Sequence, residues 1–149
     1  RGIPHRMELI SIRDSVRYIN DSKGTNVSAT VKALTGVETG VVLILGGRDK
    51  EGDFTPLADA IRKKRAKVIL IGEAADKIAS ALGGYADVLR AADMAEAVRT
   101  GASVSKPGDT VLLSPACASF DMYKNFEERG EMFRRAVAAL KPGLGALNA

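Results

Sequence analysis

Three polar segments of the sequence hold residue types that could bind or process a small ligand, and each follows a predicted strand. They cover residues 20–26, 47–53 and 114–126. Their side chains include two cations, three hydroxyls and four carboxylates, namely Lys23 and Lys50, Ser22, Thr25 and Ser119, and Asp21, Asp49, Asp53 and Asp121. Such groups suit a small molecule that bears carboxylates or phosphates. Each residue alone is also explained as a helix cap, a turn former or a solvated surface group, so only their shared position favours a site.

The third segment is the most informative. Residues 110–113 are predicted to form a buried strand, Ser114 and Pro115 end it, small residues follow, and an amphipathic helix begins by about Lys124. This order places backbone N–H groups and a hydroxyl at the carboxyl end of a sheet, where open α/β folds bind ligands and anions in particular. An ordinary strand–loop–helix connection explains the same residues equally well.

Several other chemistries lack the residues that they require. No phosphate-binding loop of the form G-x-x-x-x-G-K-[ST] is present, and Gly46-Gly47 lacks the third glycine of a dinucleotide fingerprint. One histidine and one cysteine cannot build a usual zinc site, so we expect no metal site. Cys117 lies far in the sequence from His5, the only histidine. We therefore interpret Cys117 as a packing residue and assign no catalytic residue within the chain.

The composition is that of one soluble globular domain. The chain has 149 residues, of which 46% are hydrophobic and 27% charged. The single cysteine fits a reducing cytoplasm, and neither a signal peptide nor an apolar run of about 20 residues is present. We therefore predict a cytoplasmic protein without membrane contact. Because the sequence opens at Arg1 without a methionine, we also expect a piece of a longer protein.

The net charge of +4 is mild, and its densest basic run covers residues 62–65, with Lys67 just beyond. Such a run could bind nucleic acid. It also fits the solvated last turn of a helix, where cations complement the helix dipole. We favour the second interpretation and predict no nucleic-acid partner, because no aromatic residues alternate with the charges for base stacking.

The hydrophobic pattern predicts strands and helices that alternate along the chain. Strands are expected at residues 7–12, 16–19, 41–45, 68–71, 86–89 and 110–113. Three helices are expected to begin at a capping residue: at Thr25 or Asn26 for the helix that ends at Leu34, at Thr55 for the helix that runs past Ile61, and at an Asp93–Glu96 capping box for the helix at 94–102. Two more helices are expected, one around Ile78 and Leu82 and one over about 124–140.

This alternation predicts a Rossmann-like three-layer α/β/α domain with a six-stranded, mostly parallel sheet. The first two predicted strands are joined by a short polar turn at residues 13–15, so they should form a hairpin that adds one antiparallel strand at an edge. We divide the chain into an interdomain linker at residues 1–6, the domain at 7–140 and a C-terminal tail at 141–149.

Several motifs together resemble the C-terminal domain of the Mur ligase family, in the branch that adds D-glutamate. They are Pro-His-Arg at residues 4–6, Asn-Asp-Ser-Lys-Gly-Thr-Asn at 20–26, Leu-Gly-Gly at 45–47, Leu-Leu-Ser-Pro-Ala-Cys-Ala-Ser-Phe-Asp at 112–121, Lys-Asn-Phe at 124–126 and Arg-Gly at 129–130. They occur in the family's order and span nearly the whole chain.

The resemblance implies one part of an ATP-dependent amide ligase of peptidoglycan precursor synthesis. In that family ATP phosphorylates the alanyl carboxylate of UDP-N-acetylmuramoyl-L-alanine, and the D-glutamate amine attacks the acyl phosphate. This domain would bind D-glutamate and close onto ATP and Mg²⁺, which the central domain would hold for the most part. The central domain and the uridine-nucleotide-binding domain are not in this chain, so we expect the isolated chain to be inactive.

The resemblance also implies roles for individual residues. The implied D-glutamate contacts are Thr25, Lys50, Ser119, Phe120 and Phe126. The implied ATP-side contacts are His5, Arg6, Asp21 and Lys23. Two other functions stay open on the residues alone: a non-catalytic α/β module that binds a small ligand or regulates, and a stand-alone nucleotide-binding domain.

Overall fold

The computed structural model describes residues 4–48, 52–119 and 121–141. Its elements in chain order are β1 (Glu8–Arg13), β2 (Val16–Asn20), α1 (Val27–Gly36), β3 (Val41–Gly46), α2 (Thr55–Lys64), β4 (Lys67–Ile71), α3 (Ala75–Leu82), β5 (Val88–Arg90), α4 (Met94–Val104), β6 (Thr110–Leu113) and α5 (Phe126–Ala138). The predicted tail lies outside the described residues except for Lys141, which is exposed.

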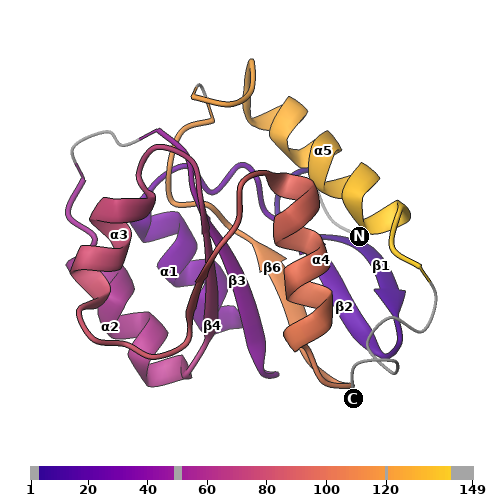
Figure 1. Ribbon diagram of the computed structural model, residues 1–149, viewed down its shortest axis with the longest axis horizontal. Coiled ribbons are helices and arrows are strands. Elements are labelled where there is room, and N and C mark those ends of the chain that lie inside the picture. Colours follow the sequence, from indigo (N-terminus) through magenta and orange to yellow (C-terminus); the bar gives the residue numbers. More distant parts are fainter. Residues whose placement is uncertain (1–3, 49–51, 120, 142–149) are drawn as a thin grey trace.

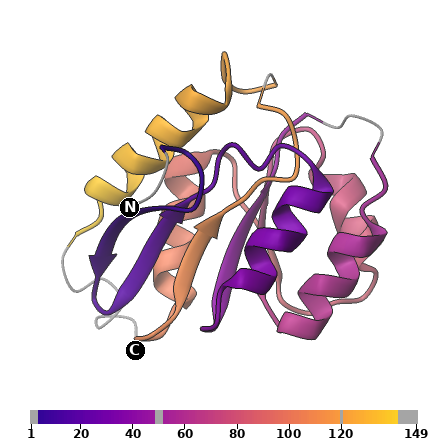
Figure 2. The ribbon, with the colours of Figure 1, turned by 180° about the vertical axis from the view of Figure 1, so that it is seen from behind.

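Six strands form one sheet in the order β1-β2-β6-β3-β4-β5, and only the β1–β2 pair is antiparallel (Figure 1). Helices α1, α2 and α3 cover one face of the sheet, and α4 and α5 cover the other, as the view from behind also shows (Figure 2). The predicted three-layer α/β/α architecture with an N-terminal hairpin is therefore confirmed.

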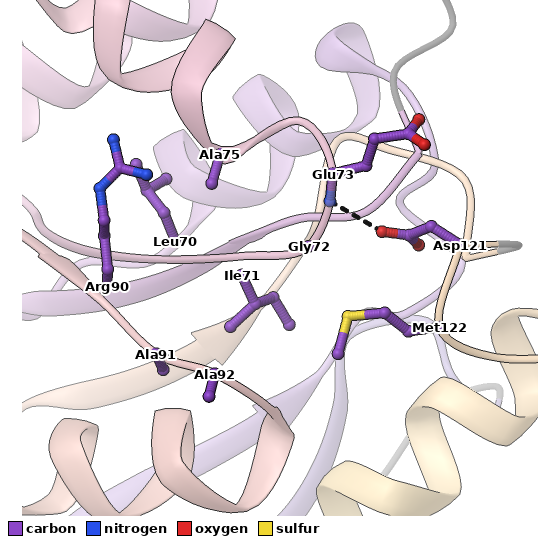
Figure 3. Close-up of a pocket in the computed structure, with 10 residues that line it drawn as sticks. All are labelled: Leu70, Ile71, Gly72, Glu73, Ala75, Arg90, Ala91, Ala92, Asp121 and Met122. Atoms are coloured by element: carbon purple, nitrogen blue, oxygen red, sulfur yellow. Dashed lines mark hydrogen bonds between the residues drawn. The ribbon is translucent and has the colours of Figure 1, made fainter.

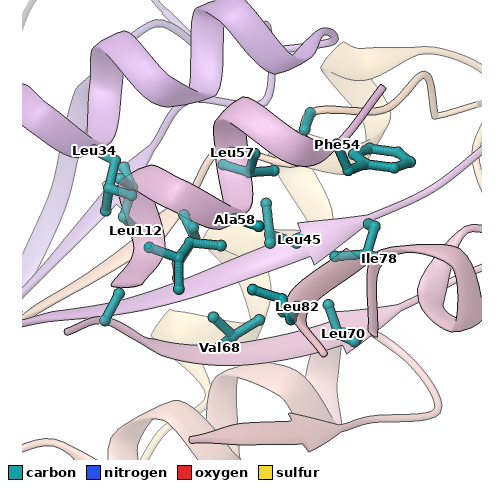
Figure 4. Close-up of a cluster of buried hydrophobic side chains, with 14 of the residues drawn as sticks. Leu34, Leu45, Phe54, Leu57, Ala58, Val68, Leu70, Ile78, Leu82 and Leu112 are labelled. Carbon is teal, nitrogen blue, oxygen red and sulfur yellow. The ribbon is translucent and has the colours of Figure 1, made fainter. Parts of the chain in front are cut away.

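The strand sequences explain why both faces are covered. In β3 the residues Leu43 and Leu45 point toward α1–α3, while Val42 and Ile44 point toward α4 and α5. All four are at most 1% exposed, as expected for the continuous apolar run of a parallel strand buried on both faces. The α1–α3 side includes Leu34, Phe54 and Leu57, which pack over the sheet (Figure 4).

The hairpin has a two-residue loop, because Arg13 pairs with Val16. Both loop residues, Asp14 and Ser15, have positive φ angles of 51° and 62°. Two consecutive left-handed residues are typical of a type I′ turn, whose twist matches the twist of the paired strands.

The helix boundaries differ from the sequence-based ones at two starts. Thr55 was predicted to cap α2, but the N-cap is Phe54, and Thr55 is the first helical residue, whose N–H donates to Asp53 Oδ1. The last helix begins at Phe126 rather than Lys124, because the side chain of Asn125 accepts the Glu128 N–H and caps it. By contrast, the predicted Asp93 cap on α4 is confirmed, since Asp93 Oδ1 accepts the Glu96 N–H at 2.8 Å.

The basic run forms the last turn of α2, as predicted, and its cations bind backbone carbonyls of neighbouring elements. Arg62 donates to Leu82 O at the end of α3, and Lys64 donates to Val37 O. Just beyond, Lys67 donates to Val104 O at the end of α4, at 2.8 Å. Positive charge at the C-terminal end of a helix interacts favourably with the helix dipole and with its unpaired carbonyls. These three cations therefore hold the amino-terminal edge of the sheet together.

Candidate functional site

The loops after β2, β3 and β6 meet at the carboxyl ends of adjacent strands. The chain leaves β3 toward α2 on one face of the sheet and leaves β6 toward α5 on the opposite face. Open α/β sheets bind ligands at the point where two neighbouring strands connect to helices on opposite faces of the sheet. The two loops are joined by backbone bonds from Gly46 N–H to Pro115 O at 3.0 Å and from Arg48 N–H to Ala118 O at 2.8 Å.

Asp21 lies in the loop after β2 and is 5% exposed. Its Oδ2 accepts the Ser114 hydroxyl at 2.7 Å, and its Oδ1 accepts the Met7 N–H at 3.1 Å. Burial raises the pKa of this carboxyl above its ordinary value, although both hydrogen bonds act in the opposite direction. Asp21 thus ties the segment before β1 to the end of β6, and both of its oxygens have partners within the protein.

His5, Lys23 and Phe126 come together from three separate parts of the chain. The rings of His5 and Phe126 meet edge to face at 6.1 Å, and Lys23 Nζ lies 5.9 Å from the centre of the Phe126 ring. The His5 Nδ1 atom lies 3.0 Å from Asn20 Nδ2. Because Lys23 and Arg6 are exposed while His5 and Phe126 are only partly buried, this cluster offers cations and an aromatic edge at the surface.

Two further predicted site residues belong to the same loops. Ser119 is 2% exposed, and its carbonyl accepts the N–H groups of Met122 and Tyr123. Thr25 is partly buried directly before the Asn26 cap of α1, whose side chain accepts the Ala29 N–H. The structure therefore places every described member of the predicted set on these loops, at the first residue of α5 or on the segment before β1. Lys50 and Phe120 lie outside the described residues.

The loop after β3 approaches the loop after β6 closely because of a glycine. Gly47 has a φ angle of 143°, a conformation that L side chains rarely adopt. A Cβ atom there would overlap Ala118 O and lie 3.1 Å from both Cys117 Cβ and Arg129 Nη1. Any side chain at this position would push the two loops apart.

An open pocket of about 550 Å³ lies beside this region, at the carboxyl ends of β4 and β5 (Figure 3). Its walls include Gly72, Glu73, Arg90, Asp121 and Met122, and Asp121 Oδ2 accepts the Glu73 N–H across it at 2.9 Å. None of the described residues to which the resemblance gives a ligand contact lines this pocket, but Asp121, a carboxylate of the third polar segment, does. The predicted set lies on the β2–β6 side, so the pocket and the predicted site are neighbours rather than the same place.

Three buried polar residues in this region received no ligand contact from the resemblance, although Ser22 was counted among the hydroxyls of the first polar segment. Asn20, Ser22 and Arg129 are at most 1% exposed. Arg129 was quoted only as part of a motif, but its position indicates more, since it falls on the apolar stripe of α5 between Phe126 and Phe133. A charged residue on the buried stripe of a helix is rare and needs polar partners.

Within the part of the chain that the structure describes, no cluster of three or more His, Cys, Asp or Glu side chains could hold a metal ion. In the same part, no helix has the length and apolar character needed to cross a membrane. The described parts of these loops carry cations, hydroxyls and backbone N–H groups, which suit an anionic molecule.

Comparison with known proteins agrees with this geometry. A family model described as "Mur ligase, glutamate ligase domain" matches residues 5–117. The chain is 48% identical over 143 residues to the UDP-N-acetylmuramoylalanine--D-glutamate ligase of Geobacter sp., a match that covers 96% of this chain and 32% of that protein. It is 52% identical over 143 residues to the protein of the same name from Hahella chejuensis, covering 93% and 32%.

Solved structures share the fold at low sequence identity. A UDP-N-acetylmuramate-alanine ligase from Thermotoga maritima superposes with a TM-score of 0.61 at 16% identity, over 95% of this chain and 31% of that one. A domain of a protein from Haemophilus ducreyi, described as a putative UDP-N-acetylmuramate:L-alanyl-gamma-D-glutamyl-diaminopimelate ligase, gives 0.58 at 19% identity, over 91% of this chain and 100% of that one.

The chain spans about a third of the length of the curated relatives that it matches. The match to the family model nevertheless runs from His5 through all six strands to Cys117. It includes the loops after β2 and β3 and the first four residues of the segment after β6, 114–117. This chain belongs to the Mur ligase family, to its glutamate ligase domain.

Proposed function

We propose that the chain is the C-terminal domain of a ligase that adds D-glutamate to UDP-N-acetylmuramoyl-L-alanine in peptidoglycan precursor synthesis. The observation that carries this proposal is identity of about half the residues, over more than nine tenths of the chain, to relatives named for that reaction. In this role the domain binds D-glutamate in the cytoplasm and closes onto ATP and Mg²⁺ held mainly by the rest of the ligase.

The proposed reaction is an amide synthesis in two steps. The alanyl carboxylate attacks the γ-phosphoryl group of ATP, which gives an acyl phosphate and releases ADP. The D-glutamate amine then attacks the acyl carbon, loses a proton and expels inorganic phosphate. A related solved structure, a MurF ligase from Thermotoga maritima, was determined with ADP, which supports a nucleotide in the family's reaction.

The residues proposed to hold D-glutamate are Thr25, Lys50, Ser119, Phe120 and Phe126. D-glutamate carries two carboxylates around one amine, so a lysine, hydroxyls and free N–H groups suit it. Positioning the amine against the acyl phosphate and neutralising charge would supply most of the rate enhancement. The proximity of the β2, β3 and β6 loops supports one shared site for these residues.

The residues proposed for the ATP side are His5, Arg6, Asp21 and Lys23. The exposure of Arg6 and Lys23 supports a role as phosphate contacts, because both charges are accessible. The Asp21 oxygens accept from Ser114 and Met7, so a contact with ribose would use the acceptor capacity that these two hydrogen bonds leave. His5 would act beside Phe126, which couples the two ends of the site.

The test is steady-state kinetics of the full-length protein with ATP, D-glutamate and UDP-N-acetylmuramoyl-L-alanine. Replacing Lys50 or Ser119 by Ala is expected to raise the KM for D-glutamate about tenfold, since each removes a hydrogen bond to a charged ligand. An unchanged D-glutamate KM in both variants removes these residues from the site. Absence of turnover in the wild-type protein favours the non-catalytic alternative instead.

The isolated 149-residue chain tests the remaining alternative, a stand-alone nucleotide-binding domain. As part of a larger ligase it should form no product by itself and bind ATP weakly, because most phosphate contacts would lie in the other domains. Tight ATP binding by the isolated chain, measured by calorimetry, would indicate a stand-alone nucleotide-binding domain.

A further inference from the structure

Arg129 is the largest fully buried side chain of the described residues, with 1% of its surface exposed. Burial lowers the pKa of its guanidinium to about 10, which still leaves it protonated at neutral pH. Among the residues that the structure describes, no carboxylate lies within ion-pair distance of Arg129. A buried cation is costly unless its N–H groups are paired, so its partners indicate its role.

The guanidinium donates to three oxygen atoms on two of the site loops. Its Nε donates to the Ser22 hydroxyl at 3.0 Å, and its Nη2 donates to Ser22 O at 2.8 Å. Its Nη1 donates to Cys117 O at 2.9 Å. The rigid, planar guanidinium suits such divergent acceptors, whereas the single ammonium of lysine does not. One side chain of α5 therefore fixes both the loop after β2 and the loop after β6.

Ser22 extends this network to the start of α5. Its hydroxyl accepts from Arg129 and donates to Phe126 O at 2.6 Å, so the hydroxyl is fully used. Its N–H donates to Asn20 Oδ1 at 3.0 Å. Phe126 and the neighbours of Ser22 belong to the proposed ligand contacts, whereas the side chains of Arg129 and Ser22 direct these hydrogen bonds to protein atoms.

The loop after β3 packs against the same guanidinium. A Cβ on Gly47 would lie 3.1 Å from Arg129 Nη1, which shows how closely the backbone approaches it. Two of the loops proposed to hold the amino acid therefore bond to one buried side chain, and the third passes close beside it. Stability alone does not require this arrangement, since well-packed apolar residues commonly replace buried charges without loss.

We propose that Arg129 is a positioning residue for the amino-acid site, which sets the relative placement of the three loops through Ser22, Cys117 and Gly47. This inference rests on the proposed function for the identity of the ligand. Substitution of Arg129 should then weaken D-glutamate binding more than ATP binding. Of the residues beside Ser22, Asp21 and Lys23 belong to the proposed ATP side, but most ATP contacts would come from other domains.

The experiment compares Arg129→Lys, Ser22→Ala and the double variant in the full-length protein, with KM measured for D-glutamate and for ATP. Arg129→Lys keeps the positive charge but cannot reach all three acceptors. We expect its D-glutamate KM to rise about tenfold or more, with the ATP KM within about twofold. Because the two residues act as a unit, the double variant should be close to Arg129→Lys alone.

Val137→Ala is the matched control. Val137 lies on the same face of α5 two turns later, is fully buried, and packs against the sheet rather than the loops. It should lower thermal stability without changing the D-glutamate KM. Equal effects of Val137→Ala and Arg129→Lys on this KM, or strictly additive effects of Arg129→Lys and Ser22→Ala, would overturn the proposal.

Amide hydrogen exchange in the same proteins provides a readout that does not depend on turnover. Arg129→Lys should accelerate exchange at residues 22–25 and 116–119, whereas Val137→Ala should not. If the wild-type protein fails to use D-glutamate, the proposed function is wrong, and faster exchange at these loops still supports the positioning role. Unchanged exchange at both loops refutes that role, whatever the kinetics.

Discussion

Replacing Gly130 by Ala tests how His5 is held against α5. Gly130 is buried in the second turn of that helix, directly under the His5 ring. A Cβ atom at this position would overlap His5 Nδ1, and would lie 2.7 Å from His5 Cε1 and 2.9 Å from Asn20 Nδ2. The added methyl group must therefore expel the imidazole from its place between Asn20 and Phe126.

The expected change in stability follows from these contacts. In a helix interior, Gly→Ala normally stabilises by about 1 kcal/mol. Here the displaced ring loses its hydrogen bond with Asn20, which costs about 1 kcal/mol, and its edge-to-face contact with Phe126, which costs about 1 kcal/mol more. Gly130→Ala should therefore destabilise the fold by about 1 kcal/mol in total.

Gly101→Ala is a matched control in the interior of α4. A Cβ atom there would lie 3.4 Å from Val111 Cγ1 and 3.6 Å from Ile69 Cδ1, which is ordinary van der Waals contact. This variant should be stabilised by about 1 kcal/mol. The two variants should thus differ by about 2 kcal/mol, which corresponds to roughly 4–8 °C in Tm for a domain of this size.

Thermal denaturation of the 149-residue chain, followed by circular dichroism, measures this difference. Because His5 is the only histidine, its ring protons are identified at once in NMR spectra, and their contacts with the Phe126 ring should vanish in Gly130→Ala. A Gly130→Ala variant at least as stable as Gly101→Ala, with the His5–Phe126 contacts intact, would refute the reasoning.

Three further substitutions test other contacts. Asn125→Ala should destabilise by about 1 kcal/mol in urea titrations through loss of the α5 cap, whereas Asn125→Asp should be nearly neutral. Ser15→Gly should raise Tm, because the left-handed conformation costs about 1 kcal/mol for a residue with a side chain. Burial raises the pKa of Tyr123 to about 12 from 10.0, so the unfolded phenol ionises first on raising the pH. The contribution of the buried, neutral Tyr123 side chain to the free energy of unfolding is therefore complete below pH 10 and is lost as the pH rises through about 12. Tyr123→Phe should show a smaller loss of stability than the wild type over that pH range.

The fold was predictable because its signals are local. The continuous apolar runs of β3 and β4 indicate strands buried on both faces, and their alternation with amphipathic helices fixes the parallel topology. The prediction that Thr55 caps α2 was wrong, because a Thr-Pro pair suits the first helical turn as well as the N-cap position. The burial of Phe54 in the core makes Phe54 the N-cap and Thr55 the first helical residue.

The site was predictable only in part. The three loops could be placed at one edge of the sheet, because the carboxyl ends of parallel strands meet there. The hydrogen-bond partners of Arg129 could not be predicted, since Ser22 lies 107 residues away in the chain and their hydrogen bond depends on tertiary packing. The burial of Asp21 also arises from long-range contacts, with Ser114 93 residues later in the chain. The ligand roles of all nine predicted residues stay predictions, and Lys50 and Phe120 also lie outside the described residues.

The backbone bonds that precede β1 decide where this domain can be cut or exchanged. His5 O accepts the Lys23 N–H at 2.9 Å, and the Met7 N–H donates to Asp21, so the loop after β2 is shaped by residues upstream of the first strand. A chimera that joined another family member's chain at Glu8 would keep the whole sheet, but both bonds would then require the foreign backbone to follow the same path, which has positive φ angles at residues 5 and 7. Domain exchange between ligases should therefore place its junction before His5, so that the loop travels with the residues that shape it.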